Sequence, residues 1–553
     1  MTNCNIVTSI FENAVTQPDI LAIAEPKSPG DPIPIDGIIP YRNMNFRELA
    51  TEVDIVSRGL LKHGFKKGDR VVLMVPPSIN FFTLCFAFMH IGVVPVLIDP
   101  GIGITNLKKC IKEANPVGFI GISKAHIARV VFGWGKKSIR KKVSIGPGLF
   151  YGGLPFNKIM KSGRSIAENS DGFLESFQAA ENDLAAILFT SGSTGISKGV
   201  SYTYGNFMHQ VKGISSTFGM ESGEIDLPTF PPFALFNPVV GVSTIIPDMD
   251  ATRPASVDPK KIIATIRQFN ITNMFGSPAL IDRVGRYAEM KKYELPSLKR
   301  VITAGAPVPE KALRRFSKLL NDGIHIYTPY GATEVMPVTC VGSDYLLMEN
   351  IRMRSIKGGG ICIGKPVKNI ELKIIKITDD VIASWSNDLE LDFGEVGEIV
   401  VKGPNVTKAY YNREVETRLA KIMTKNGFYH RMGDLGYRDE TGNVWYCGRK
   451  AHRVRTEDRE LYSVQCETIF NQHPMVYRTA LVSVNREAVL CVEVDKEVIN
   501  PNLEEIKIDL TECALQNNLN VKAFLFHPSF PVDKRHNAKI FREKLAKWAA
   551  SRL

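Results

Sequence analysis

Cysteine pairs are missing from this 553-residue sequence in the spacing that a cysteine-rich zinc site or a redox pair needs. The nine cysteines are scattered, odd in number and never arranged as C-x-x-C, which excludes a disulfide-dense scaffold. We expect buried, reduced thiols, as in a cytoplasmic protein. The first residues lack a basic stretch followed by an apolar run, so no signal peptide is predicted.

Long apolar runs are scarce too, and one segment needs a closer look. Residues 81–98 are about as long as a membrane span. However, His90 lies midway, and Gly92 and Pro95 divide the segment into a helix-like and a strand-like half. We therefore predict a buried helix followed by a buried strand. The sequence also lacks internal repeats and long low-complexity stretches, which excludes a solenoid.

Acidic residues are slightly outnumbered. Lys plus Arg number 69 and Asp plus Glu 57, which gives a formal net charge of +12. With 44% hydrophobic and 23% charged residues, the composition is that of a globular protein and not of a disordered one. Because zinc-finger spacing, an RNP1-like string and a bZIP heptad array are all missing, we predict no nucleic-acid partner.

One basic stretch leaves two interpretations open. Residues 130–142 place Val130, Val131, Phe132 and Trp134 beside five cations. The stretch is either a solvated basic loop or a patch that contacts anionic lipid with the help of an aromatic side chain.

Strand-like and helix-like segments alternate along most of the chain. Residues 46–63 have helical periodicity, residues 70–75 form a short apolar run, and the alternation returns over residues 259–304. This order predicts βαβ units and mostly parallel sheets. Residues 394–402 and 443–447 instead follow turns and indicate antiparallel strands. We place a boundary near 447–452, where a short basic stretch restarts the pattern.

The most informative string is T-S-G-S-T-G-I-S-K-G, residues 190–199. Its glycines let backbone N–H groups approach an oxyanion, its hydroxyls add donors, and its lysine adds a mobile charge. Strand patterns on both sides predict a strand-to-strand turn. The spacing fits neither a Walker A loop nor a G-x-G-x-x-G fingerprint. The candidate phosphate ligands are Thr190, Ser191, Gly192, Ser193, Thr194, Gly195 and Lys198.

This string resembles the phosphate loop of the adenylate-forming superfamily, which comprises acyl-CoA synthetases, luciferases and peptide-synthetase adenylation domains. The resemblance implies ATP and Mg²⁺ as cofactors. It also implies an α/β fold with a large N-terminal lobe, residues 1–447, of several subdomains with mostly parallel sheets plus a small β-barrel-like part. A small, mobile α+β C-terminal lid, residues 448–553, would complete the molecule.

A second string, Y-T-P-Y-G-A-T-E, ends at Glu334 and resembles the family's Y-G-x-T-E motif. The resemblance implies that Tyr330 stacks on adenine beside Gly331 and that Thr333 contacts the α-phosphate. Glu334, together with Thr194, would hold Mg²⁺. An aromatic face, a hydroxyl and a hard oxygen ligand suit these three roles.

Three further strings resemble nucleotide-binding segments of the same superfamily. T-A-G-A-P at residues 303–307 resembles the adenine-binding turn, and H-R-M-G-D-L-G at residues 430–436 resembles the segment whose aspartate binds the ribose hydroxyls. C-G-R-K, which begins at Cys447, resembles the hinge segment whose arginine reaches the ribose or the phosphate. The residues implied are Gly305, Ala306, Pro307, Asp434 and Arg449.

The last string, P-V-D-K-R-H-N-A-K-I-F-R, ends at Arg542 and resembles the P-x-x-x-x-G-K-I-x-R motif, with Ala538 in place of the glycine. The resemblance implies that Lys539 bridges the carboxylate and the nucleotide during adenylation. Lys539, Lys198, Thr333 and Glu334 are therefore the candidate catalytic residues.

The acceptor of the acyl group is less clear from the motifs. Acyl-CoA synthetases of this superfamily usually carry a K-x-x-G loop after the hinge, where this sequence has Asp458 near the glycine position. Residues 227–238, 246–250, 275–279 and 530–549 resemble olefin-biosynthesis β-lactone synthetases. That resemblance implies a long-chain 3-hydroxy acid, often 2-alkyl-branched, whose own hydroxyl attacks the adenylate and expels AMP.

Two alternatives stay open at this stage. The first is a long-chain fatty acyl-CoA synthetase or acyl-AMP ligase, in which coenzyme A would be a partner. The second is a lipid- or nucleic-acid-binding protein without enzymatic activity. Olefin-pathway enzymes are further candidate partners. Four phenylalanines either line an acyl pocket or pack in the core: Phe230, Phe233, Phe236 and Phe275.

Overall fold

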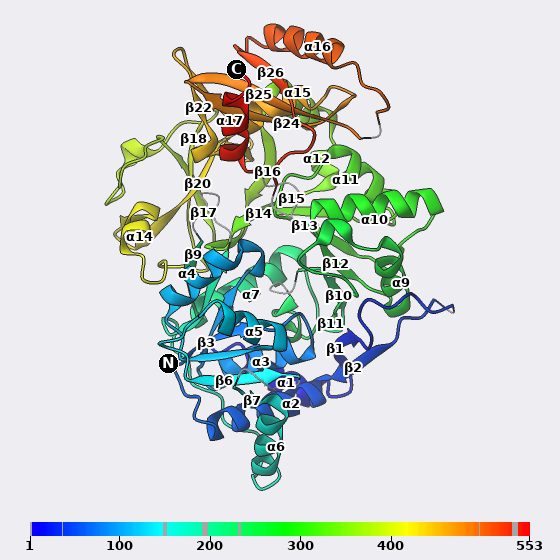
Figure 1. Ribbon diagram of the computed structural model, residues 1–553, viewed down its shortest axis with the longest axis vertical. Coiled ribbons are helices and arrows are strands. Elements are labelled where there is room, and N and C mark those ends of the chain that lie inside the picture. Colours follow the sequence, from blue (N-terminus) through cyan, green and yellow to red (C-terminus); the bar gives the residue numbers. More distant parts are fainter. Residues whose placement is uncertain are drawn as a thin grey trace.

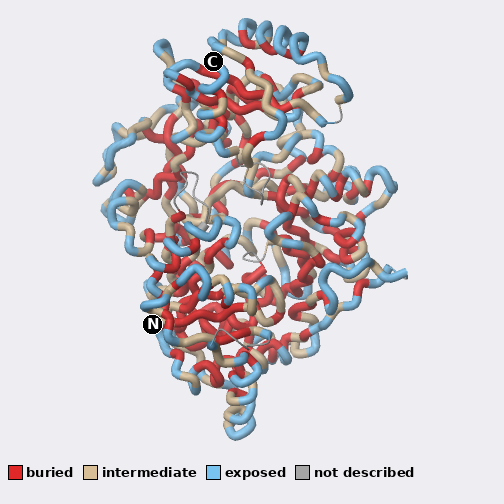
Figure 2. The backbone as a smooth tube through the Cα atoms, in the orientation of Figure 1, coloured by how far each residue is buried: buried red, intermediate tan, exposed pale blue. Residues whose placement is uncertain are grey.

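The structure is a computed structural model that describes residues 3–35, 37–146, 152–190, 197–230, 234–496, 498–532 and 540–553. Two sheets and their helices make up the large lobe, and the C-terminal residues form a smaller α+β domain at the top of Figure 1. Buried residues fill the interior of the molecule, whereas exposed ones lie on the outer loops and on the outer faces of helices (Figure 2). The predicted α/β class is confirmed.

The first sheet has the strand order β7-β6-β5-β3-β4-β8-β9. All neighbours are parallel except β8 and β9, which form an antiparallel pair. The strands are β3 (Arg70–Met74), β4 (Val94–Ile98), β5 (Gly118–Ile122), β6 (Lys141–Ile145), β7 (Leu154–Pro155), β8 (Leu184–Thr190) and β9 (Lys198–Thr203). The helices around it are α1 (Thr8–Thr16), α2 (Phe46–Lys62), α3 (Ile79–His90), α4 (Ile104–Ala114), α5 (Ser123–Val131), α6 (Phe156–Ala167) and α7 (Tyr204–Phe218).

The apolar segment 81–98 is an interior helix and strand, as predicted. Ser78 caps α3 by accepting a hydrogen bond from the backbone N–H of Phe81, and the chain then turns into β4. Residues 79–90 are almost entirely screened from solvent, except Asn80. Within the described ranges, no helix combines the length and the apolar character needed to cross a bilayer.

The second sheet joins a parallel part to an antiparallel part. Strands β1, β11, β10, β12, β13 and β14 run parallel, and from β15 onward every pairing is antiparallel. The parallel strands are β1 (Leu21–Pro26), β10 (Ile225–Pro228), β11 (Ser243–Ile245), β12 (Asn273–Gly276), β13 (Arg300–Thr303) and β14 (Ile326–Ala332). The antiparallel strands are β2 (Tyr41–Asn45), β15 (Val335–Gly342), β16 (Ile361–Pro366), β17 (Glu371–Ile375), β18 (Gly397–Lys402), β19 (Lys421–Thr424), β20 (Gly427–Arg438) and β21 (Val444–Arg449).

The helices of this half are α9 (Pro259–Phe269), α10 (Pro278–Lys291), α11 (Glu310–Ser317), α12 (Ser343–Leu346), α13 (Glu349–Arg354) and α14 (Glu414–Ala420). The strands and helices predicted over 259–304 are therefore all present, within two residues at each end. The antiparallel strands predicted at 394–402 and 443–447 are β18 and β21. Strand β21 pairs with β20 on one side and with β16 on the other. The antiparallel strands and the parallel strands therefore belong to one continuous sheet.

The small C-terminal domain has a core of its own. Its three-stranded sheet, in the order β24-β25-β26, lies beside a two-stranded β22-β23 pair. The strands are β22 (Val454–Arg455), β23 (Glu460–Leu461), β24 (Val476–Val484), β25 (Glu487–Val494) and β26 (Ala523–Phe526), and the helices are α15 (Ser463–Phe470), α16 (Leu503–Gln516) and α17 (Arg542–Ala550). Strand β21 runs past residue 447 to Arg449, and the division at 447/448 stays a prediction.

All nine cysteines are free. Seven are buried, and Cys340 and Cys513 are half-buried. Burial raises the pKa of the Cys110 thiol to about 12, so this thiol stays protonated and unreactive. Packing therefore accounts for these cysteines.

Burial of His90 at the end of α3 predicts acid sensitivity. Its Nδ1 lies 3.0 Å from Ser176 Oγ, and burial lowers the pKa of the imidazole from 6.5 to about 4. Between these values the unfolded chain binds a proton that the folded chain does not. The free energy of unfolding should therefore fall as the pH drops from 6.5 to 4, by up to about 3 kcal/mol from this group. His90→Gln should remove that part, as measured by urea unfolding at several pH values.

His63→Gln is the matched control, because His63 is half-buried and its Nε2 also lies beside a serine hydroxyl, 3.2 Å from Ser162 Oγ. This variant should keep the acid slope of the unchanged protein. An identical slope in His90→Gln would contradict the assignment.

Candidate functional site

The glycine- and hydroxyl-rich string connects two antiparallel strands, as predicted. Thr190 ends β8, Lys198 begins β9, and these two residues are paired across the ladder. Five of the predicted phosphate ligands lie outside the described residues: Ser191, Gly192, Ser193, Thr194 and Gly195. The positions of Thr190 and Lys198 nevertheless fix both ends of the turn.

Strand β9 is tied to the turn that carries Thr333 and Glu334. The Tyr202 hydroxyl, on β9, donates to the backbone carbonyl of Thr333. On the other edge of β9 runs the segment 409–411, where the Tyr411 N–H donates to the Gly199 carbonyl at 2.7 Å. Strand β9 therefore contacts two segments that lie more than a hundred residues further along the chain, one at Thr333 and one at residues 409–411.

Tyr410 contacts both Glu334 and Lys198. Its hydroxyl donates to Glu334 Oε1 at 2.6 Å, and Lys198 Nζ lies 4.9 Å from the centre of its ring. Burial, and next the Glu334 carboxylate, raise the pKa of the Tyr410 phenol far above its usual value, so the phenol stays a donor. Sequence reasoning missed Tyr410, because nothing in its local string indicates which strand it joins.

A buried lysine, Lys421, contacts the residue that holds the Glu334 backbone, and a buried histidine, His430, is paired with this lysine across two strands. The Glu334 carbonyl accepts from both the N–H and the hydroxyl of Thr407, at 2.9 and 3.0 Å, and Lys421 Nζ donates to the Thr407 carbonyl. Burial lowers the pKa of Lys421 to about 7, while Glu334 opposes this shift. Burial, with Lys421 second, lowers the pKa of His430 well below its usual value. Sequence reasoning missed this layer as well.

The predicted ribose aspartate lies between two other predicted site residues. Asp434 is on β20, directly opposite Arg449 at the end of β21. The Tyr330 hydroxyl donates to Asp434 Oδ2 at 2.6 Å, and Arg449 Nε lies 3.1 Å from Oδ1. This ion pair lacks hydrogen-bond alignment, and Oδ1 has no hydrogen-bond partner among the described residues. A buried carboxylate oxygen in this state fits a ribose hydroxyl as its missing donor.

The charges of this cluster act on one another. Burial raises the pKa of Asp434, whereas Arg449 and then the Tyr330 hydroxyl lower it, and Glu334 raises it again. The Asp434 carboxylate, in turn, raises the pKa of Arg449. Since Glu334 acts on both Tyr410 and Asp434, the phosphate-side and ribose-side residues form one electrostatic site.

The adenine-side residues follow the ends of parallel strands. Thr303 ends β13, and Gly305, Ala306 and Pro307 form the exit turn beyond it, with Pro307 exposed. The Thr303 hydroxyl is buried and makes no hydrogen bond within the described ranges. Gly331 lies in β14 next to Tyr330. Ligands of open α/β sheets bind at such carboxyl edges, so the position suits an adenine base.

Lys539 lies outside the described residues, as do its neighbours 533–538. The base of that segment is described: Val532 and Ile540 form a β-bridge, and Arg542 pairs with both carboxylate oxygens of Glu467 on α15, at 2.5 and 2.9 Å. Helix α15 packs on β21, the strand that carries Arg449. The described residues on either side of that segment are thus linked, through Arg542 and Glu467, to the helix that packs on β21.

Gly448, in β21, lies in close contact with the start of α15. Its φ is +133°, and a Cβ there would lie 2.4 Å from Ser463 Oγ at the start of α15. Only glycine fits this position without a shift. The small domain therefore sits directly on the end of β21.

Ion pairs hold the segment after the hinge against the large lobe. Arg453 and Arg455 both reach Asp379 Oδ2, at 2.8 and 3.2 Å, and Lys450 Nζ lies 3.1 Å from Glu398 Oε2. Asp458, near the place of the family's tunnel glycine, is exposed.

The candidate acyl-pocket residues separate into two groups. Phe230 and Phe275 have ring centroids 6.4 Å apart and belong to a small aromatic cluster at the carboxyl ends of β12 and β13. Phe236 instead packs in the main core of the large lobe. Phe233 lies outside the described residues. Two of the four phenylalanines thus lie beside the adenine turn.

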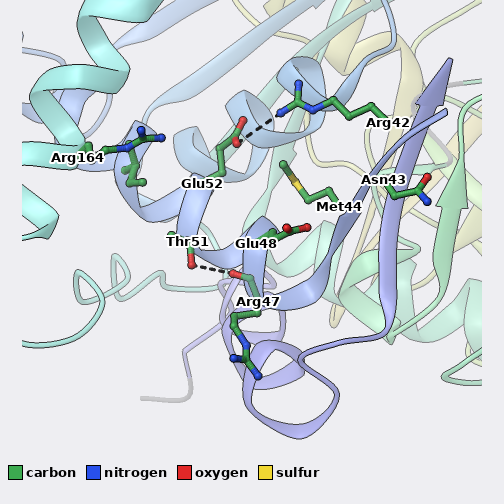
Figure 3. A pocket seen from close by; sticks show the side chains of 9 residues that line it. Arg42, Asn43, Met44, Arg47, Glu48, Thr51, Glu52 and Arg164 are labelled. Carbon is green, nitrogen blue, oxygen red and sulfur yellow. Dashed lines mark hydrogen bonds and ion pairs between the residues drawn. The ribbon is translucent and has the colours of Figure 1, made fainter. Parts of the chain in front are cut away.

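A surface cavity of about 340 Å³ lies elsewhere, between β2, α2 and α6. Figure 3 shows Arg42 directed toward Glu52 across it, with an N–O distance of 3.9 Å. None of the residues predicted from the sequence lines this cavity. It is lined by Arg42, Asn43, Met44, Arg47, Glu48, Thr51, Glu52, Ile55 and Arg164.

Comparisons with known proteins agree with this geometry. The profile of a family described as AMP-binding enzyme matches residues 12–411. The olefin beta-lactone synthetases of Xanthomonas campestris pv. campestris and Stenotrophomonas maltophilia are each 42% identical to this chain. These alignments cover 99% and 100% of this chain, and 98% and 99% of the relatives.

A solved structure shows the same fold. The O-succinylbenzoate coenzyme A synthetase of Bacillus subtilis, in complex with ATP and magnesium ion, superposes with a TM-score of 0.73 at 19% identity. The match covers 97% of this chain and 98% of that one. The family profile extends over more than half of the chain, and full-length relatives support it. The chain therefore belongs to the AMP-binding enzyme family, as an AMP-forming, adenylate-forming ligase.

Proposed function

We propose that this enzyme adenylates a long-chain 3-hydroxy fatty acid, often 2-alkyl-branched, with ATP and then closes the adenylate to a β-lactone. The observation that carries the proposal is the single electrostatic site formed by Lys198, Tyr410 and Glu334 with Asp434 and Arg449. Full-length similarity to proteins named olefin beta-lactone synthetase supports the second step.

Adenylation must overcome charge repulsion. The carboxylate of the acid approaches a polyphosphate, and two unit charges about 4 Å apart repel by about 4 kcal/mol at an effective dielectric near 20. Lys198 at the phosphate turn offsets part of this repulsion, and the Thr333 hydroxyl adds a donor toward the α-phosphate. Asp434 and Arg449 hold the ribose, which fixes the α-phosphorus in line with the attacking oxygen.

Glu334 is suited to hold Mg²⁺ together with ATP phosphates and Thr194. Tyr410 engages one oxygen of the carboxylate, and the other fits a hard cation held mainly by phosphate oxygens. When bound, Mg²⁺ supplies positive charge to the phosphates. The described residues contain no group of three or more His, Cys, Asp or Glu arranged to hold a metal, so one protein carboxylate plus substrate oxygens is the fitting arrangement.

Lys539 completes the site from the small domain. Its ammonium would bridge the reacting carboxylate and the α-phosphate, which requires residues 448–553 to close on residues 1–447 as a mobile lid. The anchors of its segment support this role, because Arg542 and Glu467 lie next to β21. Closure would also exclude water from the adenylate.

Lactone closure then needs no second substrate. The β-hydroxyl oxygen attacks the acyl carbonyl carbon, a C–O bond forms, the bond between the acyl carbon and the phosphate oxygen breaks, AMP leaves, and the hydroxyl proton passes to solvent. An intramolecular nucleophile acts at high effective concentration. CoA-dependent members of the superfamily usually carry a K-x-x-G loop, whose glycine serves thiol entry. This sequence has Asp458 near that position and lacks the glycine, which suits an enzyme without a thiol acceptor. Phe230 and Phe275, whose rings lie 6.4 Å apart, are our candidates for contact with the acyl chain.

Product analysis tests the function directly. The enzyme is incubated with ATP, Mg²⁺ and a 2-alkyl-3-hydroxy fatty acid, with and without coenzyme A, and products are identified by mass spectrometry. We expect a β-lactone, AMP and diphosphate without coenzyme A. A thioester formed only with coenzyme A would show an acyl-CoA synthetase, a released acyl-AMP would show an acyl-AMP ligase, and no ATP turnover would contradict the proposal.

Lys539→Ala should remove most of the adenylation activity. The loss of its positive charge should reduce pyrophosphate release by about 100-fold or more, since such electrostatic contacts commonly contribute this much. The circular dichroism spectrum and the unfolding midpoint should not change. Lys544→Ala, on the exposed face of α17, is the control and should retain full activity. Unchanged pyrophosphate release in Lys539→Ala would refute its role.

Tyr410→Phe should raise the Mg²⁺ requirement. The variant keeps the ring under Lys198 but loses the hydrogen bond to Glu334, and charge-assisted bonds of this kind contribute about 1.5 kcal/mol or more. The half-saturating Mg²⁺ concentration for pyrophosphate release should therefore rise by about tenfold. Tyr411→Phe, one residue away, should behave like the unchanged enzyme. An unaltered Mg²⁺ dependence in Tyr410→Phe would mean that this bond does not position Glu334.

A further inference from the structure

The positive charge of the chain is concentrated in one stretch. Residues 103–142 contain ten Lys and Arg but only one carboxylate, Glu113. This stretch alone therefore supplies a net charge of +9, against +12 for the whole chain. Such segregation creates a strong local field that a uniformly mixed surface lacks.

The structure brings the two ends of this stretch together. Residues 134–139 pack on α4 through the buried side chains of Trp134 and Ile139, which share a core cluster with Leu107 and Ile111. Exposed cations of α4 and of the turn that follows α5 therefore border one surface. We call this surface the α4–α5 basic face. Its exposed cations are Lys108, Lys109, Lys112, Lys136, Lys137 and Arg140.

The one carboxylate does not offset this field. Glu113, near the end of α4, pairs with the segment that follows Tyr410: its Oε2 accepts from Arg413 Nε and Nη2 at 3.0 and 2.7 Å. Its negative charge is therefore already matched by Arg413. The α4–α5 basic face is left without an acidic side chain of its own.

An apolar ridge lies beside these cations. Ile127, Val130, Val131 and Phe132 at the end of α5 are 51%, 55%, 68% and 36% exposed. Among the described residues, no other six consecutive positions hold four large exposed hydrophobic side chains. The ridge would gain free energy from any apolar phase that it could enter.

The tip of the ridge is held in place. Gly133 adopts a φ of +63°, which turns the chain directly after Phe132. The Phe132 ring stacks on Trp134, with centroids 5.8 Å apart, and Trp134 itself is only 3% exposed. Of the two aromatic side chains in this stretch, Trp134 therefore anchors the turn, and Phe132 is the exposed ring.

We propose that the α4–α5 basic face docks this enzyme on anionic phospholipid membranes. Lysine and arginine side chains attract the headgroups, while the ridge at the end of α5 inserts into the boundary between headgroups and acyl chains. Both features are needed, because a cationic surface alone explains binding to any polyanion and an apolar ridge alone explains binding to any hydrophobic surface. A second copy of the chain fits poorly, since the same positive face would repel itself.

The docking face borders the catalytic region. Helix α4 packs against β9, the strand that begins with Lys198, and the Glu113–Arg413 ion pair leads to the segment that contains Tyr410. A membrane-bound enzyme would thus hold its phosphate-binding side close to the bilayer. This inference stands apart from the proposed reaction, because vesicle binding requires no turnover.

Vesicle co-sedimentation of the full chain tests the proposal. We expect binding to vesicles of phosphatidylcholine with phosphatidylglycerol, little binding to phosphatidylcholine alone, and a decrease as NaCl rises from about 0.05 to 0.5 M. Lys136→Glu with Lys137→Glu should weaken binding by about 25-fold or more, because each cation near the surface contributes about fivefold. Val131→Ser with Phe132→Ser should weaken it by about tenfold.

The matched control is Lys291→Glu with Lys311→Glu, which reverses two exposed lysines on α10 and α11. It carries the same change in net charge and should bind nearly as well as the unchanged protein. Equal losses in this control would show a general charge effect and overturn the site. Absence of binding to anionic vesicles, or binding that ignores both patch variants, would overturn the proposal, and retention on an acidic protein alone would assign the face to a protein partner instead.

Discussion

The contact between the Tyr410 phenol and the Glu334 carboxylate is the interaction on which the catalytic region depends. One side of this phenol faces Lys198 of the first sheet, and its hydroxyl reaches a turn of the second sheet. The two sheets of the large lobe also share part of their core, because Ile23 of the second sheet belongs to the same buried cluster as Val71 and Val200 of the first. One aromatic side chain therefore contacts both Lys198 of the first sheet and Glu334 of the second, beside the bond from Tyr202 to the Thr333 carbonyl.

Such a site is costly to build, because charges are taken out of water before a ligand arrives. The surrounding residues offset that cost in different ways. Arg449 neutralises Asp434, Thr407 holds the backbone of Glu334, and the buried Lys421 shares its amine with a carbonyl instead of a carboxylate. The result is a region whose charged side chains are already held by neighbouring groups, which is the condition for strong electrostatic stabilisation.

Much of the fold and the order of the motifs could be predicted from the sequence. Periodicity located α2, α9 and α10, and a turn followed by an apolar run located β3 and β18, because these signals are local. The predicted partners Tyr330, Asp434 and Arg449 do lie together. The resemblance supplied that grouping, since spacing alone relates none of the three.

What sequence reasoning missed depends on contacts between distant segments. Tyr410 reaches its place because residues 409–411 cross to the edge of β9, and no local pattern specifies this pairing. The sequence of residues 130–142 left open whether Phe132 or Trp134 faces inward, because a short basic turn does not reveal this. The sequence did not single out Lys421, because burial of a charge is a property of the assembled molecule.

The close fit at Gly448 has a consequence for how the two domains could evolve. With no side chain there, α15 rests directly on the last strand of the large lobe. A methyl group at this point would lie 2.4 Å from the Ser463 hydroxyl and 3.3 Å from the Val464 nitrogen, on a backbone whose φ of +133° already disfavours any side chain. Any residue larger than glycine at 448 would therefore force a shift where α15 begins, and substitutions at this position should be poorly tolerated.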